Sequence, residues 1–210
     1  MTDIFNTALQ NIMEIVYVLP ALLISITFHE LAHGYTAYKL GDPTAKDMGR
    51  LTLNPIKHID PIGFIALLIL RFGWAKPVPY NPNYFEKRKQ GTFLVAIAGP
   101  LTNILLALIS IILIMILKPD NITIYSFLEN LFYFNVIFAI FNLLPVPPLD
   151  GSKLIASILP EKMETYFWKY EKYGYGVLLL LMVTDVIGYI LNPAINITIS
   201  ALITIGRLFY

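Results

Sequence analysis

Residues 13–34 read MEIVYVLPALLISITFHELAHG. An apolar run of this length predicts a helix that spans a membrane, because a spanning helix needs about 20 mostly apolar residues. The run ends in two histidines and a glutamate, His29, Glu30 and His33. Ionisable side chains are costly inside a bilayer and usually mark a functional site there. The stretch therefore predicts a polar site held within a membrane.

The composition agrees with a membrane protein. Of the 210 residues, 57% are hydrophobic and 14% are charged, whereas soluble domains average about 25% charged residues. The mean hydropathy is +0.66. The net charge of +1 offers no electrostatic case for binding nucleic acid. Cysteine is absent, which excludes disulfides, cysteine-ligated zinc and thiol nucleophiles. We expect a single membrane-embedded domain, 1–210, with the lipid bilayer as its surroundings.

The apolar segments predict an all-α polytopic protein. A proline interrupts the long C-terminal run at Asn192-Pro193, so we expect two short spans there. The apolar run at 62–70 would form only about 14 Å of helix, too little to cross a hydrocarbon core of about 30 Å. We therefore predict a short non-spanning, re-entrant insert and about five transmembrane helices, at 12–38, 92–117, 126–148, 175–191 and 194–209.

The basic residues predict the orientation of these spans. With segments 39–61, 71–90 and 150–174 and the C-terminus on one side, only Lys118 of the 15 lysines and arginines falls on the other. The positive-inside rule makes the basic side cytoplasmic. We expect the N-terminus outside, the C-terminus in the cytoplasm, and His29 and His33 toward the cytoplasmic side.

The histidine spacing predicts a metal site. Residues four apart on a helix share one face, so His29 and His33 can reach one ion. Glu30 can then act as a general base on a water, which is the HExxH pattern of zinc proteases. Catalytic zinc usually has three protein ligands and one open position. A third ligand must come from another part of the chain.

Asp150 is the favoured third ligand, although other residues are candidates. It follows an apolar span, and three prolines in PVPPLDG, 145–151, interrupt helical structure just before it. Irregular backbone at membrane depth is tolerated only where it is buried in protein or lines a cavity. The remaining candidates are His58, which would otherwise be an interfacial histidine of the insert, and the carboxylates Asp42, Asp47, Asp60 and Glu161.

Four segments together resemble one known family. They are FHELAHGYTAYKLGDPTAKDMGRLTLNPIKHIDPIG at 28–63, GWAKPVPYNP at 73–82, AIAGPLTNILLAL at 96–108 and FNLLPVPPLDG at 141–151. In this order they resemble the site-2 protease family of intramembrane zinc metalloproteases, of the peptidase M50 type. The chain looks most like the compact members that lack a PDZ domain. The resemblance covers about 20–155, most of an expected core at 12–155; the C-terminal helices, 175–209, carry no motif.

The resemblance implies roles for the matching residues. One Zn²⁺ per chain would be held by His29, His33 and Asp150, with Glu30 as the catalytic base. Asn103 and Asn142 would lie near the active site and bind the substrate backbone or the oxyanion. A small membrane-associated β element is also implied, which GRLTLNP at 49–55 and KPVPYN at 76–81 would form. An edge of this element could hold an unwound substrate by strand addition.

The expected function is that of a zinc-dependent endopeptidase. Its substrate would be a membrane protein, cleaved within or near a transmembrane segment, and a prokaryotic plasma membrane suits so compact a chain. The alternative is a catalytically silent membrane scaffold or binding protein of the same fold. The complete set of His29, Glu30, His33 and Asp150 argues against it, since a scaffold needs no Glu30. A transporter is disfavoured because broken helices do not recur in two halves of the chain.

Overall fold

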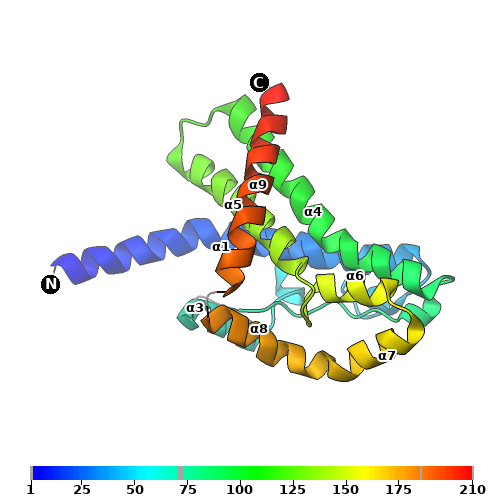
Figure 1. Ribbon diagram of the computed structural model, residues 1–210. Helices are drawn as coiled ribbons and strands as arrows, with labels where there is room; N and C mark the ends of the chain where they lie inside the picture. The colour runs from blue at the N-terminus through cyan, green and yellow to red at the C-terminus, as the bar shows by residue number, and fades with distance from the viewer. Residues whose placement is uncertain (1, 71–72, 185, 210) are drawn as a thin grey trace.

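The computed structural model describes residues 2–70, 73–184 and 186–209, and this part of the chain is mostly helical (Figure 1). No strand is assigned within these three ranges. The longer helices are α1 (Thr2–Lys39), α3 (Pro61–Leu70), α4 (Arg88–Leu117), α5 (Ile122–Asn142), α6 (Asp150–Ile158), α7 (Glu161–Tyr170), α8 (Gly174–Val183) and α9 (Val186–Gly206). The predicted all-α class is therefore confirmed.

The centre of the fold is a bundle in which α1, α4 and α5 contact one another, and α9 packs against α4 and α5. A buried apolar cluster joins α4, α5 and α9 through Ala107, Ile111, Phe132, Val136 and Leu202. In Figure 1, α1 crosses behind this group and its N-terminal end projects away from it. The bundle brings residues from distant parts of the chain to one place.

The outer surface of the bundle is apolar. On α4, Leu101 and Leu105 are 57% and 56% exposed, although both are large hydrophobic residues. The inward face of the same helix carries small residues, among them Gly91, Ala96 and Gly99. Small residues between helices and large apolar ones outside are typical of membrane bundles, where the outer face meets lipid. The pattern supports a protein embedded in a bilayer.

Three helical stretches are long and apolar enough to cross a membrane: Arg88–Leu117, Ile122–Asn142 and Val186–Phe209. They confirm the predicted integral membrane protein, while the predicted number of about five crossings is not confirmed. The third expected span, 126–148, ends earlier, because α5 stops at Asn142. The prolines that follow, from Pro145 onward, cannot continue the helix.

The predicted division of the C-terminal run is wrong. Helix α9 continues through Pro193, and the interruption lies between the end of α8 at Val183 and the start of α9 at Val186. Proline removes one backbone hydrogen bond from a helix, and membrane helices tolerate this loss. Helix α8 has ten residues, about 15 Å, and is too short to cross a bilayer. Asp185 lies outside the described residues.

This change also corrects the expected position of the C-terminus. A Cβ atom placed on Gly206, at the end of α9, would lie 3.1 Å from Met115 Sδ near the end of α4. Both helices therefore end on the same side of the bundle (Figure 1), and Lys118 follows directly after α4. Arg207 directly follows α9, so it lies at the same end of the bundle as Lys118 rather than beside the basic residues that precede α4.

The insert between α1 and α4 contains the short helix α3. Its ten residues correspond to about 15 Å, as expected for a segment that does not cross. The predicted small β element is not confirmed, since the described residues of this region form one isolated antiparallel bridge, between Ile59 and Ala75. Arg71, expected on the basic side, lies outside the described residues.

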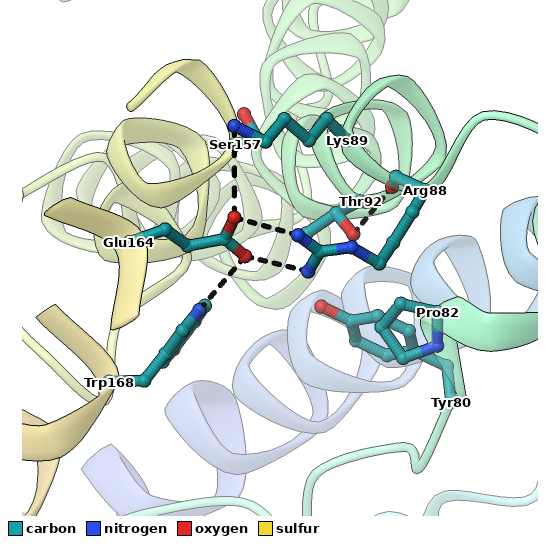
Figure 2. Close-up of a pocket in the computed structure, with 8 residues that line it drawn as sticks. All are labelled: Tyr80, Pro82, Arg88, Lys89, Thr92, Ser157, Glu164 and Trp168. Atoms are coloured by element: carbon teal, nitrogen blue, oxygen red, sulfur yellow. Dashed lines mark hydrogen bonds and ion pairs between the residues drawn. The ribbon is translucent and has the colours of Figure 1, made fainter. Parts of the chain in front are cut away.

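Helix α7 is attached to the start of α4 by a paired charge (Figure 2). Arg88 Nη1 and Nη2 donate to the two carboxylate oxygens of Glu164 at 2.6 and 2.7 Å, and Trp168 Nε1 donates to the same carboxylate at 3.2 Å. The Glu164 side chain is 8% exposed. Hydrogen bonding from Arg88 lowers the pKa of Glu164 below its ordinary value. The cavity beside this pair, which Tyr80 also lines, includes none of the four predicted catalytic or metal-binding residues.

The absence of cysteine allows the position of the C-terminus to be tested directly. We predict that Asp120→Cys and Arg207→Cys react with a membrane-impermeant maleimide from the same side of sealed vesicles. Lys87→Cys, just before α4, should react only from the opposite side. Labelling of Arg207→Cys together with Lys87→Cys would contradict the packing of α9 alongside α4.

Acid should release α7 from α4. Because the pKa of Glu164 is lowered in the folded protein, its contribution to stability is complete above the unfolded value of about 4.3. That contribution is lost as the pH falls through the lower folded value. In a Trp74→Phe background, Trp168 is the remaining tryptophan of the two, and its emission should shift to the red on acidification. Glu164→Gln should give the same shift at neutral pH, and emission that stays unchanged in both cases would contradict this role.

Candidate metal centre

His29 and His33 lie one turn apart on α1, as their spacing predicts. Their Nε2 atoms are 3.0 Å apart and their rings meet edge to face, with centroids separated by 4.6 Å. Each residue is only 7% exposed. Both rings face α4, since His29 contacts Asn103 and His33 contacts the carbonyl of Val95. The two histidines therefore present their Nε2 atoms to one shared point inside the bundle.

Asp150 completes this group from the other end of the chain. It begins α6, directly after the irregular loop 143–149, and is 5% exposed. Its Oδ2 atom lies 3.0 Å from both histidine Nε2 atoms. A Cβ on the next residue, Gly151, would overlap the carbonyl oxygens of Leu143 and Leu144. Glycine at this position thus lets the loop fold back tightly enough to bring Asp150 to the histidines.

The outer nitrogens of both rings are engaged by acceptors. His29 Nδ1 lies 2.6 Å from Asn103 Oδ1, and His33 Nδ1 lies 2.7 Å from the carbonyl oxygen of Val95. A carbonyl oxygen only accepts hydrogen bonds, so both Nδ1 atoms carry the proton and donate it. In the neutral rings, each Nε2 then keeps a free electron pair. Metal-bound histidines almost always donate their other N–H in this way.

The donor set fits a zinc ion. Two Nε2 atoms and one carboxylate oxygen form a triangle with 3.0 Å sides, whose centre is about 1.7 Å from each corner. His29, His33 and Asp150 would together supply the three protein ligands that are usual for catalytic zinc. Without a cation, three electron-rich atoms would face one another in a buried space.

Gly99 of α4 forms one wall of this space. A Cβ atom placed there would lie 2.6 Å from His29 Cε1 and 2.7 Å from His29 Nε2, and would also overlap His33 Nε2. Any larger residue would therefore displace both rings. The glycine permits α4 to approach α1 closely enough to enclose the donors on this side.

Glu30 is the neighbour of His29 in sequence, is 9% exposed and points to a different partner. Its Oε2 atom accepts a hydrogen bond from the backbone N–H of Val78 at 2.7 Å. The segment around Val78 is itself held in place by Arg50, whose guanidinium donates to the carbonyls of Lys76 and Pro77 at 2.7 and 3.1 Å. Glu30 is therefore oriented by the insert between α1 and α4.

Several contacts of the centre were not predicted. Lys153 Nζ donates to Asp150 Oδ1 at 3.3 Å, on the oxygen that does not face the histidines. Ser25 and Asn135 lie behind Asn103 and are fully buried. Asn135 had a recognisable sign in the sequence, as a polar residue within the apolar stretch FYFNVIF, and Ser25 had one within LLISITF. Val78 had none, because it acts through its backbone.

The other candidates for the third ligand serve elsewhere. Asp42 Oδ1 accepts from the backbone of Thr44, Asp60 Oδ1 caps the start of α3, and His58 Nε2 contacts the carbonyl of Thr52. Asp47 and Glu161 are exposed. Among the described residues, the acidic, histidine or cysteine side chains that converge closely enough to hold a metal are His29, His33 and Asp150.

The two predicted asparagines occupy different environments. Asn103 is fully buried behind His29, with its oxygen toward the ring and its amide nitrogen toward Ser25 and Asn135. Asn142 is half-buried at the end of α5, where Nδ2 donates to the carbonyl of Phe138 at 3.0 Å. Contact of either residue with a substrate stays a prediction. For Asn103 this contact is disfavoured, because its side chain is buried and already paired with His29, Ser25 and Asn135.

Comparison with known proteins identifies the family. The model of peptidase family M50 matches residues 17–123 and 118–184. The chain belongs to peptidase family M50. This M50 protein is 42% identical over 188 residues to "Putative zinc metalloprotease YwhC" of Bacillus subtilis, with 86% of each chain covered. It is 28% identical over 187 residues to "Putative zinc metalloprotease Rip2" of Mycolicibacterium smegmatis, covering 86% of this chain and 69% of the relative. No solved structure matches it.

The resemblance to site-2 proteases is therefore confirmed, and zinc is the cofactor that the family implies. The group of His29, His33 and Asp150 could hold such an ion. The family and the donor set both indicate zinc, because two imidazole nitrogens and one carboxylate oxygen are a common donor set of catalytic zinc.

The role of Gly99 leads to a prediction about metal content. Gly99→Ala should weaken zinc binding by at least the roughly tenfold expected when ligand orientation is disturbed, because its Cβ displaces the histidine rings. The affinity is measured by competition with a chelator, and the zinc content by mass spectrometry. Gly176→Ala in α8 is the matched control, since its Cβ would meet nothing within 4 Å. Full zinc affinity in Gly99→Ala would contradict the geometry of the centre.

Proposed function

We propose that this M50 protein is an intramembrane endopeptidase that hydrolyses a peptide bond within or near a transmembrane segment of another membrane protein. The observation that supports the proposal most strongly is the location of the metal-binding group. His29, His33 and Asp150 converge between α1 and α4, and α4 presents its large apolar side chains outward. This position inside a bundle with an apolar outer surface supports a substrate that enters from the bilayer.

Zinc, when bound, supplies a Lewis acid that activates water and polarises a peptide carbonyl. Glu30 supplies the proton transfer. The N–H of Val78 binds Oε2 of Glu30, which orients the carboxylate and leaves Oε1 as the oxygen to take a proton from the attacking water. The same carboxylate then gives the proton to the leaving amine. His29 and His33 keep their own protons on Nδ1, held by Asn103 and Val95, and take no part in the transfer.

The substrate must lose its helical hydrogen bonds locally before its carbonyl can be attacked. Strand addition to the insert remains our proposal for how the unwound stretch is held. Most backbone hydrogen-bonding groups of segment 76–78 already have partners. Lys76 N donates to His58, Val78 N donates to Glu30, and the carbonyls of Lys76 and Pro77 accept from Arg50. Pairing at this segment would therefore require the substrate to replace an existing contact.

We further propose that the centre lies toward the cytoplasmic side of a prokaryotic plasma membrane, with the N-terminus outside. The basic residues that flank α4 and α7 support this orientation through the positive-inside rule. The bacterial sources of YwhC and Rip2 support the prokaryotic setting. With α9 ending beside α4, the C-terminus then lies outside as well.

Glu30→Gln tests the proposal. The protein is reconstituted in liposomes with a panel of fluorescent single-span transmembrane peptides, and products are identified by mass spectrometry. We expect the substitution to leave zinc bound and to slow cleavage by about 10²–10⁴-fold, the usual contribution of a general base. Glu161→Gln, at an exposed position of α7, should leave cleavage unchanged.

Two results would contradict the proposal in different ways. Cleavage by Glu30→Gln at the rate of the unsubstituted protein would remove Glu30 from the reaction. A zinc-loaded protein that cleaves none of the peptides, yet still binds them, would favour the membrane scaffold instead.

A further inference from the structure

A fully buried chain of polar side chains extends behind His29. It links α1, α4 and α5 through Ser25, Asn103 and Asn135, each 0% exposed. Asn103 Oδ1 faces His29 Nδ1 at 2.6 Å, and Asn103 Nδ2 donates to Asn135 Oδ1 at 2.6 Å and to the carbonyl of Ser25 at 3.2 Å. A buried polar network inside an apolar bundle is costly unless its members are paired.

Two backbone carbonyls determine how both amides are oriented. Asn135 Nδ2 lies 2.7 Å from the carbonyl of Leu131 and 2.8 Å from Ser25 Oγ. Because a carbonyl only accepts, the nitrogen of Asn135 must face Leu131, and its oxygen must face Asn103. The same reasoning places the nitrogen of Asn103 toward Asn135 and the carbonyl of Ser25. The oxygen of Asn103 is then directed at His29.

The orientation of Asn103 selects the tautomer of His29. An oxygen at this position requires a proton on Nδ1 and leaves Nε2 with a free electron pair. If the Asn103 amide were reversed, its N–H would require an electron pair on Nδ1. In a neutral ring that arrangement moves the proton to Nε2, the atom that faces Asp150 and His33. A protonated Nε2 cannot bind a metal ion.

We propose that Asn135, assisted by Ser25, is a positioning residue for the zinc centre: acting through Asn103, it holds His29 in the tautomer whose Nε2 is free for the metal. The proposal rests on His29 being a zinc ligand. His33 has no comparable dependence, because its Nδ1 donates to the backbone carbonyl of Val95, and a backbone carbonyl cannot reverse.

Asn135→Leu tests the proposal on the purified protein. It removes the acceptor for Asn103 Nδ2 and leaves only the longer contact to Ser25. We expect zinc affinity, measured by competition with a fluorescent chelator, to fall about 10–100-fold, as for outer contacts of metal-bound histidines. Asn130→Leu is the matched control on the same helix. Its Nδ2 donates only to the carbonyl of Ser126, one turn earlier, and zinc affinity should not change.

A double-substitution cycle separates positioning from a general effect on packing. If Asn135 acts through Asn103, Asn135→Leu should have little further effect on zinc affinity in an Asn103→Ala background. Additive losses in the cycle would overturn the proposal. Should Asn135→Leu not fold, Ser25→Ala provides the test, because it removes the Oγ acceptor of Asn135 and otherwise only a hydrogen bond to the carbonyl of Ala21 in the same helix. A smaller loss of affinity is expected there, and unchanged affinity would overturn the proposal.

The outcomes also distinguish this inference from the zinc site on which it rests. If the unsubstituted protein binds no zinc, the site itself is wrong and the inference falls with it. If the unsubstituted protein binds zinc and Asn135→Leu binds it equally well, the inference alone is overturned.

Discussion

Three electron-pair donors meet in a buried space, and the rest of the structure depends on that convergence. The Nε2 atoms of His29 and His33 and the Oδ2 atom of Asp150 are mutually 3.0 Å apart. Unscreened by water, such an arrangement is unfavourable without a cation, and with one it becomes a strong site. The same convergence ties α1 to the loop that precedes α6, so the metal centre also joins distant parts of the chain.

Close approach of backbones makes this convergence possible. Gly99 lets α4 lie against both histidine rings, and Gly151 lets the loop after α5 fold back onto the start of α6. In a bilayer the hydrophobic effect does not drive helices together, so tight packing of small residues takes its place. The buried amides of Asn103 and Asn135 then set the register between α1, α4 and α5. Packing and chemistry at this site therefore use the same residues.

The family and the fold restrict what this site can do. The proposed cleavage of membrane substrates relies on a possible metal-binding group that lies inside an apolar bundle of an M50 protein. The insert between α1 and α4 takes part as well, since Val78 orients Glu30 and Arg50 supports the segment that carries Val78. A change in the insert could therefore reorient Glu30, the proposed catalytic base, without changing the proposed metal ligands.

The sequence alone predicted the HExxH motif and a helical membrane protein, and it favoured Asp150 over other candidates as the third ligand. These features are local: His29 and His33 share a face through helical periodicity, and Asp150 stands out because prolines end an apolar helix just before it. The tertiary structure decided what depends on contacts between distant segments. Asn103 contacts His29 across 74 positions, and Asn135 contacts Ser25 across 110. Likewise, Pro193 predicted a break that packing against α4 and α5 overrides in α9. Periodicity and composition describe which face of a helix is apolar, but only packing establishes which partner meets that face.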